Sequence, residues 1–141
     1  MRWLILSCFL PLFCGCSPNS SEEFHREGKE RCRALVEDLA KIENREQLLR
    51  AEPLLKRRFE SLVGLMIEAR EFQQKHLEEL EGEVAIEENE IDAKLETELR
   101  RIYAIEGGRE VVERAQHEAL VRLDAYERAL TRKRAQLISS R

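Results

Sequence analysis

The chain of 141 residues is long enough for one domain, and it carries a formal net charge of −4 with 37% charged and 6% aromatic residues. This composition is typical of solvated helices with a narrow apolar stripe, and the mild acidity argues against broad binding to nucleic acid. Only 6 Gly and 3 Pro are present, and Pro11 and Pro18 lie near the start, so a turn-rich β fold is excluded for the rest of the chain.

The first fifteen residues have the layout of a secretory signal peptide. Arg2 gives a positive start, and the uncharged, mostly apolar stretch from Trp3 to Phe13 follows it. A membrane-spanning helix needs about 20 apolar residues, so this stretch is too short to span a bilayer and has the length of a signal peptide. Polar residues follow at 17–21, and we expect them to form a flexible tether.

The sequence Phe13-Cys14-Gly15-Cys16 resembles the lipobox of bacterial lipoproteins. Gly15 and Cys16 match its last two positions, Cys14 is small, and Phe13 stands where Leu is usual. The resemblance, which covers about a tenth of the chain, implies that cleavage separates Gly15 from Cys16 and that the Cys16 thiol carries a diacylglycerol. Two or three acyl chains, of the palmitate kind, would then hold the protein stably to the lipid bilayer.

The residue after the lipidated cysteine bears on location. In enterobacterial-type lipoproteins Asp at this place favours the inner membrane, so Ser17 implies the outer membrane, on its periplasmic or surface face. The expected domain organisation is a signal peptide at 1–15, the lipidated Cys and tether at 16–21, and a helical domain at 22–141.

The first helix of this domain is expected to be capped by Ser20 or Ser21. Its inward face has helical spacing and consists of Phe24, Gly28, Cys32, Leu35, Val36, Leu39 and Ile42. Pro53 predicts a break, because proline disfavours helical geometry in the residue before it and suits a first helical turn. One helix should therefore end near Ala51 and the next begin near Pro53.

The second helix carries an apolar run from Leu62 to Ile67, which we expect to be the best-buried part of the protein or an interface. The acidic section that follows contains Gly82, and a helix that continues through Gly82 to Glu106 is favoured over a turn. Gly107 and Gly108 predict a stop, after which a last helix begins.

The predicted fold is therefore an all-α, elongated, antiparallel bundle resembling a coiled coil, with three long helices, or four if the chain turns at Gly82.

No residue pattern predicts a metal or another cofactor. His25, His76 and His117 lack the zinc pattern of two His four residues apart, and the Glu22-x-x-His25 pair is only half of a helical di-iron motif. We expect all three His residues to be exposed on helices.

Cys32 and two basic clusters are the remaining candidates. Cys32 lies on the apolar face and is predicted to be a small buried residue, with an intermolecular disulfide between two copies of the chain as the alternative. The clusters 56–58 and 128–134 are expected to be solvated or to offset a helix dipole, and the alternative is contact with anionic lipid headgroups or an acidic partner.

Carboxylates crowd residues 78–90, and we interpret them as a solvated helix face because a thin helical rod offers no evident cavity for acid–base chemistry. The sequence thus predicts a protein that is not an enzyme but has a structural or protein-interaction role in the cell envelope. Its protein partner is unidentified, and nucleic acid is not expected to bind. The alternative is a periplasmic chaperone that holds unfolded clients between its helices.

Overall fold

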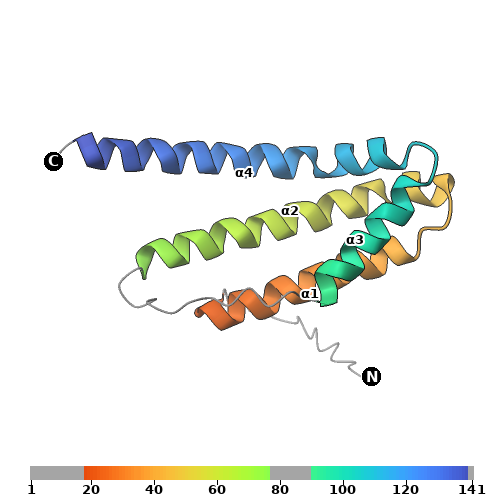
Figure 1. The fold of residues 1–141 in the computed structure, drawn as a ribbon, viewed down its shortest axis with the longest axis horizontal. Coiled ribbons are helices and arrows are strands. Elements are labelled where there is room, and N and C mark those ends of the chain that lie inside the picture. The colour runs from red at the N-terminus through yellow and green to blue at the C-terminus, as the bar shows by residue number, and fades with distance from the viewer. Residues whose placement is uncertain (1–17, 77–89, 140–141) are drawn as a thin grey trace, which may run out of the picture.

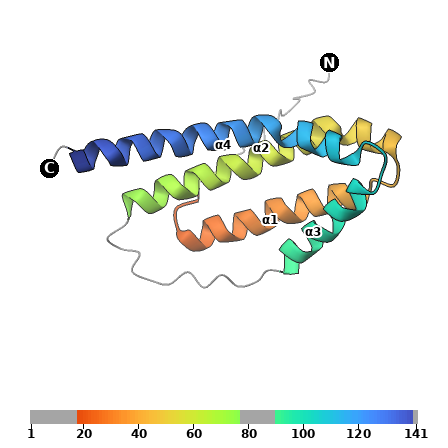
Figure 2. The same ribbon diagram turned by 45° about the horizontal axis from the view of Figure 1, so that its top comes forward.

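In a computed structural model, which describes residues 18–76 and 90–139, the protein is an all-α bundle (Figure 1). The described residues form four helices: α1 (Ser21–Ala40), α2 (Arg45–Lys75), α3 (Glu90–Tyr103) and α4 (Gly108–Ser139). Figure 2 shows two layers, with α2 beside α4 and α1 beside α3. Consecutive helices run in opposite directions, whereas the neighbours α2 and α4 run in the same direction.

The connection between α1 and α2 lies earlier than Pro53. Ser20 caps α1, as expected, by accepting a hydrogen bond from the Glu23 N–H at 3.2 Å. Asn44 caps α2 through Gln47 N–H, and α2 then continues through Pro53. The predicted break between Ala51 and Pro53 is therefore wrong. Pro53 lies on an exposed side of α2, where water can satisfy the carbonyl that the ring leaves without an N–H donor.

The favoured single helix from Pro53 to Glu106 is also wrong. α2 ends at Lys75, where His76 N–H bonds back to the Phe72 and Gln73 carbonyls, and a separate helix begins at Glu90 and packs on α1. The four-helix alternative therefore holds for the described residues. Gly82 and most of the acidic run lie outside them, so the position of the turn is not described.

The chain does break before a last helix that begins at Gly108, as predicted, but α3 already ends at Tyr103 and Gly107 belongs to the connection. Gly107 has φ +73°, the left-handed geometry that glycine adopts most easily, and Gly108 N–H donates to Ile105 O at 2.8 Å. A Cβ on Gly108 would lie 1.9 Å from the Ile102 carbonyl oxygen. Only glycine fits this close approach.

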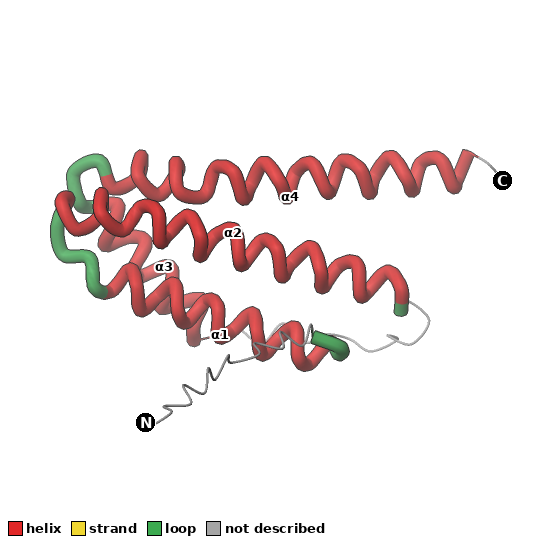
Figure 3. The backbone as a smooth tube through the Cα atoms, turned by 180° about the vertical axis from the view of Figure 1, so that it is seen from behind, coloured by secondary structure: helices red, strands yellow, loops and turns green. Residues whose placement is uncertain are grey.

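The best-buried core lies at the end of the bundle that holds the two short connections (Figure 3). Its fully buried side chains are Leu35, Leu39, Leu48, Leu55, Ile102 and Val112. The Leu62–Ile67 run is less completely covered: Val63, Leu65 and Ile67 are buried, but Met66 is 45% exposed. The expectation that this run is the best-buried part is thus corrected, because its residues surround the helix and α1 and α4 cover only two of its sides.

Candidate functional site

A groove of about 800 Å³ lies between α1 and α2 and reaches the first turn of α3. Its lining is mostly apolar and includes Phe24, Cys32, Leu62, Leu65, Met66, Ala69 and Ile91. Gly28 of α1 also lines it and faces Leu65 of α2: a Cβ placed there would lie 3.8 Å from Leu65 Cδ2, an ordinary contact. Met66 lies on the open side, so the groove presents apolar surface to solvent.

Aromatic side chains join the helices where α1 begins and α2 ends. The ring centroids of Phe24 and Phe72 are 5.4 Å apart, and His76 stacks on Phe72 at 4.2 Å. His76 Nδ1 also lies 2.9 Å from the Phe72 carbonyl oxygen. His76 is therefore partly buried just after the end of α2 and has a structural role there, which corrects the expectation that it is exposed on a helix.

Charged side chains line the rim of the groove. Arg26 and Lys29 project from α1, and Asp92 lies opposite on α3. None of the three forms an ion pair within the described residues, although many other charged side chains of the bundle do. The rim thus offers two cations and one carboxylate to whatever enters the groove. His25 stands exposed on the same rim.

Cys32 is half-buried in this groove and is a free thiol. Burial raises the pKa of the Cys32 thiol, and the nearby Asp92 carboxylate raises it further. The thiolate, not the thiol, is the nucleophile in cysteine chemistry. Cys32 therefore has the character of a packing residue. The predicted disulfide to a second copy stays a prediction.

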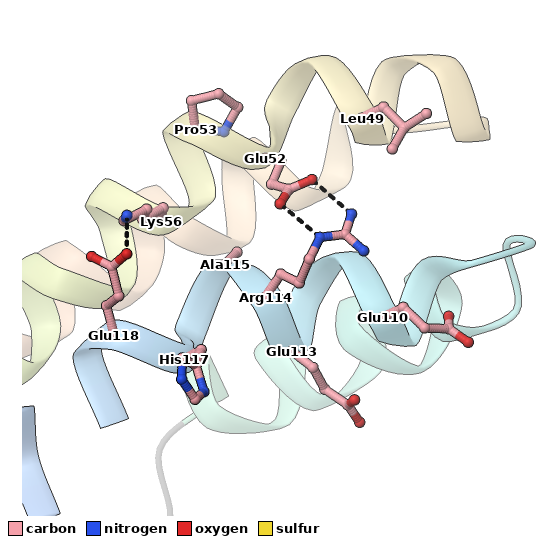
Figure 4. A pocket seen from close by; sticks show the side chains of 10 residues that line it. All are labelled: Leu49, Glu52, Pro53, Lys56, Glu110, Glu113, Arg114, Ala115, His117 and Glu118. Atoms are coloured by element: carbon pink, nitrogen blue, oxygen red, sulfur yellow. Dashed lines mark hydrogen bonds and ion pairs between the residues drawn. The ribbon is translucent and has the colours of Figure 1, made fainter. Parts of the chain in front are cut away.

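A second groove, of about 740 Å³, lies between α2 and α4 (Figure 4). Pro53 and Leu49 form its α2 side, and two ion pairs cross it. Arg114 donates twice to Glu52, at 3.0 and 2.9 Å, and Lys56 Nζ lies 2.7 Å from Glu118 Oε1.

Two carboxylates of this second groove, Glu52 and Glu118, are held in the charged form. A hydrogen bond from Arg114 lowers the pKa of Glu52, and one from Lys56 lowers the pKa of Glu118. A general acid needs a pKa raised towards the working pH, which is the opposite shift. His117 and Glu113 point away from these pairs in Figure 4. The arrangement is an ion-pair seam that joins two helices.

The predicted cleavage and lipidation residues, Gly15 and Cys16, lie outside the described residues. In the first basic cluster, Lys56 bonds Glu118 and Arg58 bonds Asp38, so two of its three charges serve packing between helices. Within residues 18–76 and 90–139, no group of three His, Cys, Asp or Glu side chains could hold a metal ion.

Sequence reasoning missed two side chains that fix the groove helices in place. Arg101 of α3 donates to the Ile42 and Leu39 carbonyls at the end of α1, with 2.7 Å between Nη2 and Leu39 O. α1 has no basic residue in its last turn, and Arg101 supplies that charge from another helix. The signal in the sequence that could have indicated the role of Arg101 was the absence of a basic residue from the last turn of α1.

The second missed side chain is Asp38, which is only 10% exposed and accepts a bond of 2.7 Å from Arg58. Burial alone would raise the pKa of Asp38, but hydrogen bonds from Arg58 and Lys41 lower it below its usual value. Asp38 therefore joins α1 to α2 in its charged form.

No protein family, curated protein or solved structure matches this chain. None of the helices in the described ranges is both long enough and apolar enough to cross a membrane.

Proposed function

We propose that this protein is a lipid-anchored component of the cell envelope, held to the outer membrane through Cys16, and that it binds an amphipathic helix of a partner protein in the groove between α1 and α2. The observation that carries the binding function is the apolar groove with the half-exposed Met66. Soluble proteins rarely leave such surface open without a use, and amphipathic helices bind in apolar grooves through residues spaced three and four apart.

The rim indicates the chemistry of the partner helix. Arg26 and Lys29 on α1 have no ion-pair partner among the described residues, so an acidic side chain beside the apolar stripe would gain charge complementarity there. Asp92 on the opposite side favours a basic residue at the other edge of the stripe. The proposed ligand is thus an amphipathic helix with acidic residues along one border and basic residues along the other.

The anchor is tested by metabolic labelling with a palmitate analogue, comparing the wild-type chain with Cys16→Ser, followed by membrane fractionation. We expect the wild type to take up label and stay with the membranes, and the variant to lose the label. A wild type that takes up no label and is recovered in the soluble fraction would contradict the anchor.

The groove is tested with a photo-crosslinking amino acid at Met66, and the same amino acid at Leu49 serves as the control. Both side chains are 45% exposed on α2, but Leu49 faces the ion-pair seam. We expect one discrete cross-linked partner from position 66 and none from position 49. With the photo-crosslinking amino acid moved to a second position in the groove, Met66→Glu should abolish cross-linking to the partner, whereas Leu49→Glu should not.

The chaperone alternative predicts a different pattern from the same experiment. A holdase would cross-link to many unrelated clients from position 66, and the amount would rise under heat stress. A cross-link that joins position 66 only to the same chain would refute both binding functions, because the groove would then be filled from within.

A further inference from the structure

The far end of α4 extends beyond the helices that cover the rest of it. The last polar contacts between α2 and α4 are Gln74 to Tyr126 at 3.4 Å and Arg70 to Glu127. Every residue from 131 to 139 is exposed. The twelve residues from Arg128 to Ser139 span about 18 Å at 1.5 Å per residue. Figure 1 shows this part of α4 reaching past the end of α2.

This segment is basic and apolar at once. Arg132, Lys133 and Arg134 make no ion pair within the described residues, and the sequence has no Asp or Glu after Glu127. Leu137 is 62% exposed and Ile138 is 78% exposed. The rest of the chain is acidic overall, so the positive charge is concentrated at this one place.

The helix dipole does not account for the cluster. Cations stabilise the carboxyl end of a helix when they lie in its last turn, and the effect falls off beyond that turn. The last turn of α4 contains no basic residue, because Lys133 and Arg134 lie earlier than Ser139 by more than one turn. The expectation that the basic residues of 128–134 offset the dipole of α4 is therefore not supported. This result favours the alternative, which is contact with lipid headgroups.

The basic segment lies at the same end of the bundle as the start of α1. Figures 1 and 3 both show α1 beginning at the end where α2 and α4 finish, opposite the two short connections. Only residues 17–20 separate Cys16 from α1, and the five steps from Cys16 to Ser21 reach at most about 18 Å. A lipid on Cys16 would thus hold this end of the bundle within about 18 Å of the bilayer, which is similar to the length of the α4 segment.

We propose that residues 128–139 of α4 dock on the anionic phospholipid headgroups of the membrane that holds Cys16. The proposal rests on the lipid anchor proposed above. Arg132, Lys133 and Arg134 contact the headgroup phosphates, and Leu137 and Ile138 enter the boundary between headgroups and acyl chains. The acidic remainder of the protein is repelled by the same surface, so the bundle stands away from the membrane with its two short connections outermost.

The test uses the unlipidated mature chain, residues 16–141, under reducing conditions, because this chain contains every described helix. Trp3 is the sole tryptophan of the sequence, so the mature chain has none. Ile138→Trp therefore places a single fluorescent reporter at the α4 end, and Ala104→Trp places one in the opposite connection as a control. The vesicles contain either phosphatidylcholine alone or phosphatidylcholine with a third of phosphatidylglycerol.

We expect the tryptophan of Ile138→Trp to shift to shorter wavelength and to be quenched by brominated acyl chains on the anionic vesicles only. The Ala104→Trp reporter should show neither change. Each basic residue near an anionic surface contributes about fivefold to partitioning, so Arg132→Gln with Arg134→Gln should weaken vesicle binding at least tenfold. The charge-matched pair Arg33→Gln with Arg57→Gln should leave binding within about twofold, because these exposed arginines lie elsewhere on the bundle.

Equal binding to neutral vesicles, no shift at position 138 on anionic vesicles, or equal losses in the two paired variants would each overturn the docking proposal. The sample carries no lipid, so its outcome is independent of palmitate labelling at Cys16. If the chain is labelled with palmitate but does not bind anionic vesicles, the proposed anchor stands and only the proposed α4 contact is refuted. If the chain is not labelled but binds anionic vesicles, only the proposed anchor is refuted.

Discussion

Replacing Gly108 with alanine tests the tightest packing of the bundle. The added Cβ would lie 1.9 Å from Ile102 O and 2.9 Å from Ile102 C, distances that real Cβ atoms essentially never show. The obstacle is backbone, so no rotamer change can relieve it, and the two segments must move apart by about 1 Å. Ile102 is fully buried, and its carbonyl accepts the 3.0 Å bond from Ile105 N–H that shapes the turn.

The magnitude follows from these two contacts. Overpacking a well-filled site costs about 1–3 kcal/mol, and a lost backbone hydrogen bond costs about 1 kcal/mol. We expect Gly108→Ala to lower the free energy of unfolding by about 2–4 kcal/mol. In Gly107→Ala the added Cβ meets no atom within 4 Å, but alanine disfavours the positive φ of this position. The variant should therefore lower the free energy of unfolding by about 1 kcal/mol. Gly64→Ala, in mid-helix with only an ordinary contact, should gain about 0.5–1 kcal/mol.

Urea unfolding followed by circular dichroism at 222 nm measures all three variants. With a slope of about 2 kcal/mol per molar urea, Gly108→Ala should move the midpoint down by about 1–2 M. A Gly108→Ala midpoint equal to or above that of Gly107→Ala would refute the close approach of α4 to the end of α3. A loss of stability in Gly64→Ala would show that glycine replacement itself, and not the clash, is being measured.

Three further substitutions are measured in the same assay. Pro53→Ala should stabilise the protein by about 1–2 kcal/mol, since it restores the hydrogen bond to Leu49 O on an exposed helix side; an unchanged midpoint would mean that the local backbone is not helical there. Arg101→Met should cost about 1–2 kcal/mol, because two carbonyls at the end of α1 lose a charged donor, and Arg101→Lys should recover part of it. Asp38→Asn should cost about 1–2 kcal/mol at pH 7, where the ion pair with Arg58 is complete. The pKa of folded Asp38 lies below its unfolded value of about 4, so this stabilisation is lost as pH falls through the folded pKa and the difference from wild type should shrink below about pH 4. A difference that stays constant as pH falls below this value would contradict the assignment.

Local chemistry predicted the helix ends that depend on one or two neighbouring residues. Ser20 caps α1 and Gly107 directly precedes α4, because each needs only its own backbone geometry and a nearby N–H. The same local reasoning wrongly predicted a helix break at Pro53. Its preference for a first turn is local, but whether a proline is tolerated inside a helix depends on which side is exposed, and that is set by the packing of α2 on α4.

The arrangement of the helices was less predictable from the sequence. Short connections indicate that consecutive helices reverse direction, and they do, but they say nothing about which non-consecutive helices pack together. The pairing of α2 with α4 in the same direction depends on contacts such as Glu52 with Arg114, far apart in sequence. The groove has the same origin: the apolar run around Met66 is visible in the sequence, whereas the groove also needs residues of α1 and α3 that lie far away in the sequence.

The position of the core gives the bundle a gradient of rigidity along its length. The fully buried leucines lie at the end with the short connections, whereas the groove, the start of α1 and the overhang of α4 lie toward the other end. Regions with few buried contacts open at a fraction of the cost of global unfolding. Amide protons near Phe24 should therefore exchange faster than those near Leu39. The first turns of α1 are therefore expected to open at a lower free energy than the core end, so local opening beside the groove would leave the rest of the bundle folded.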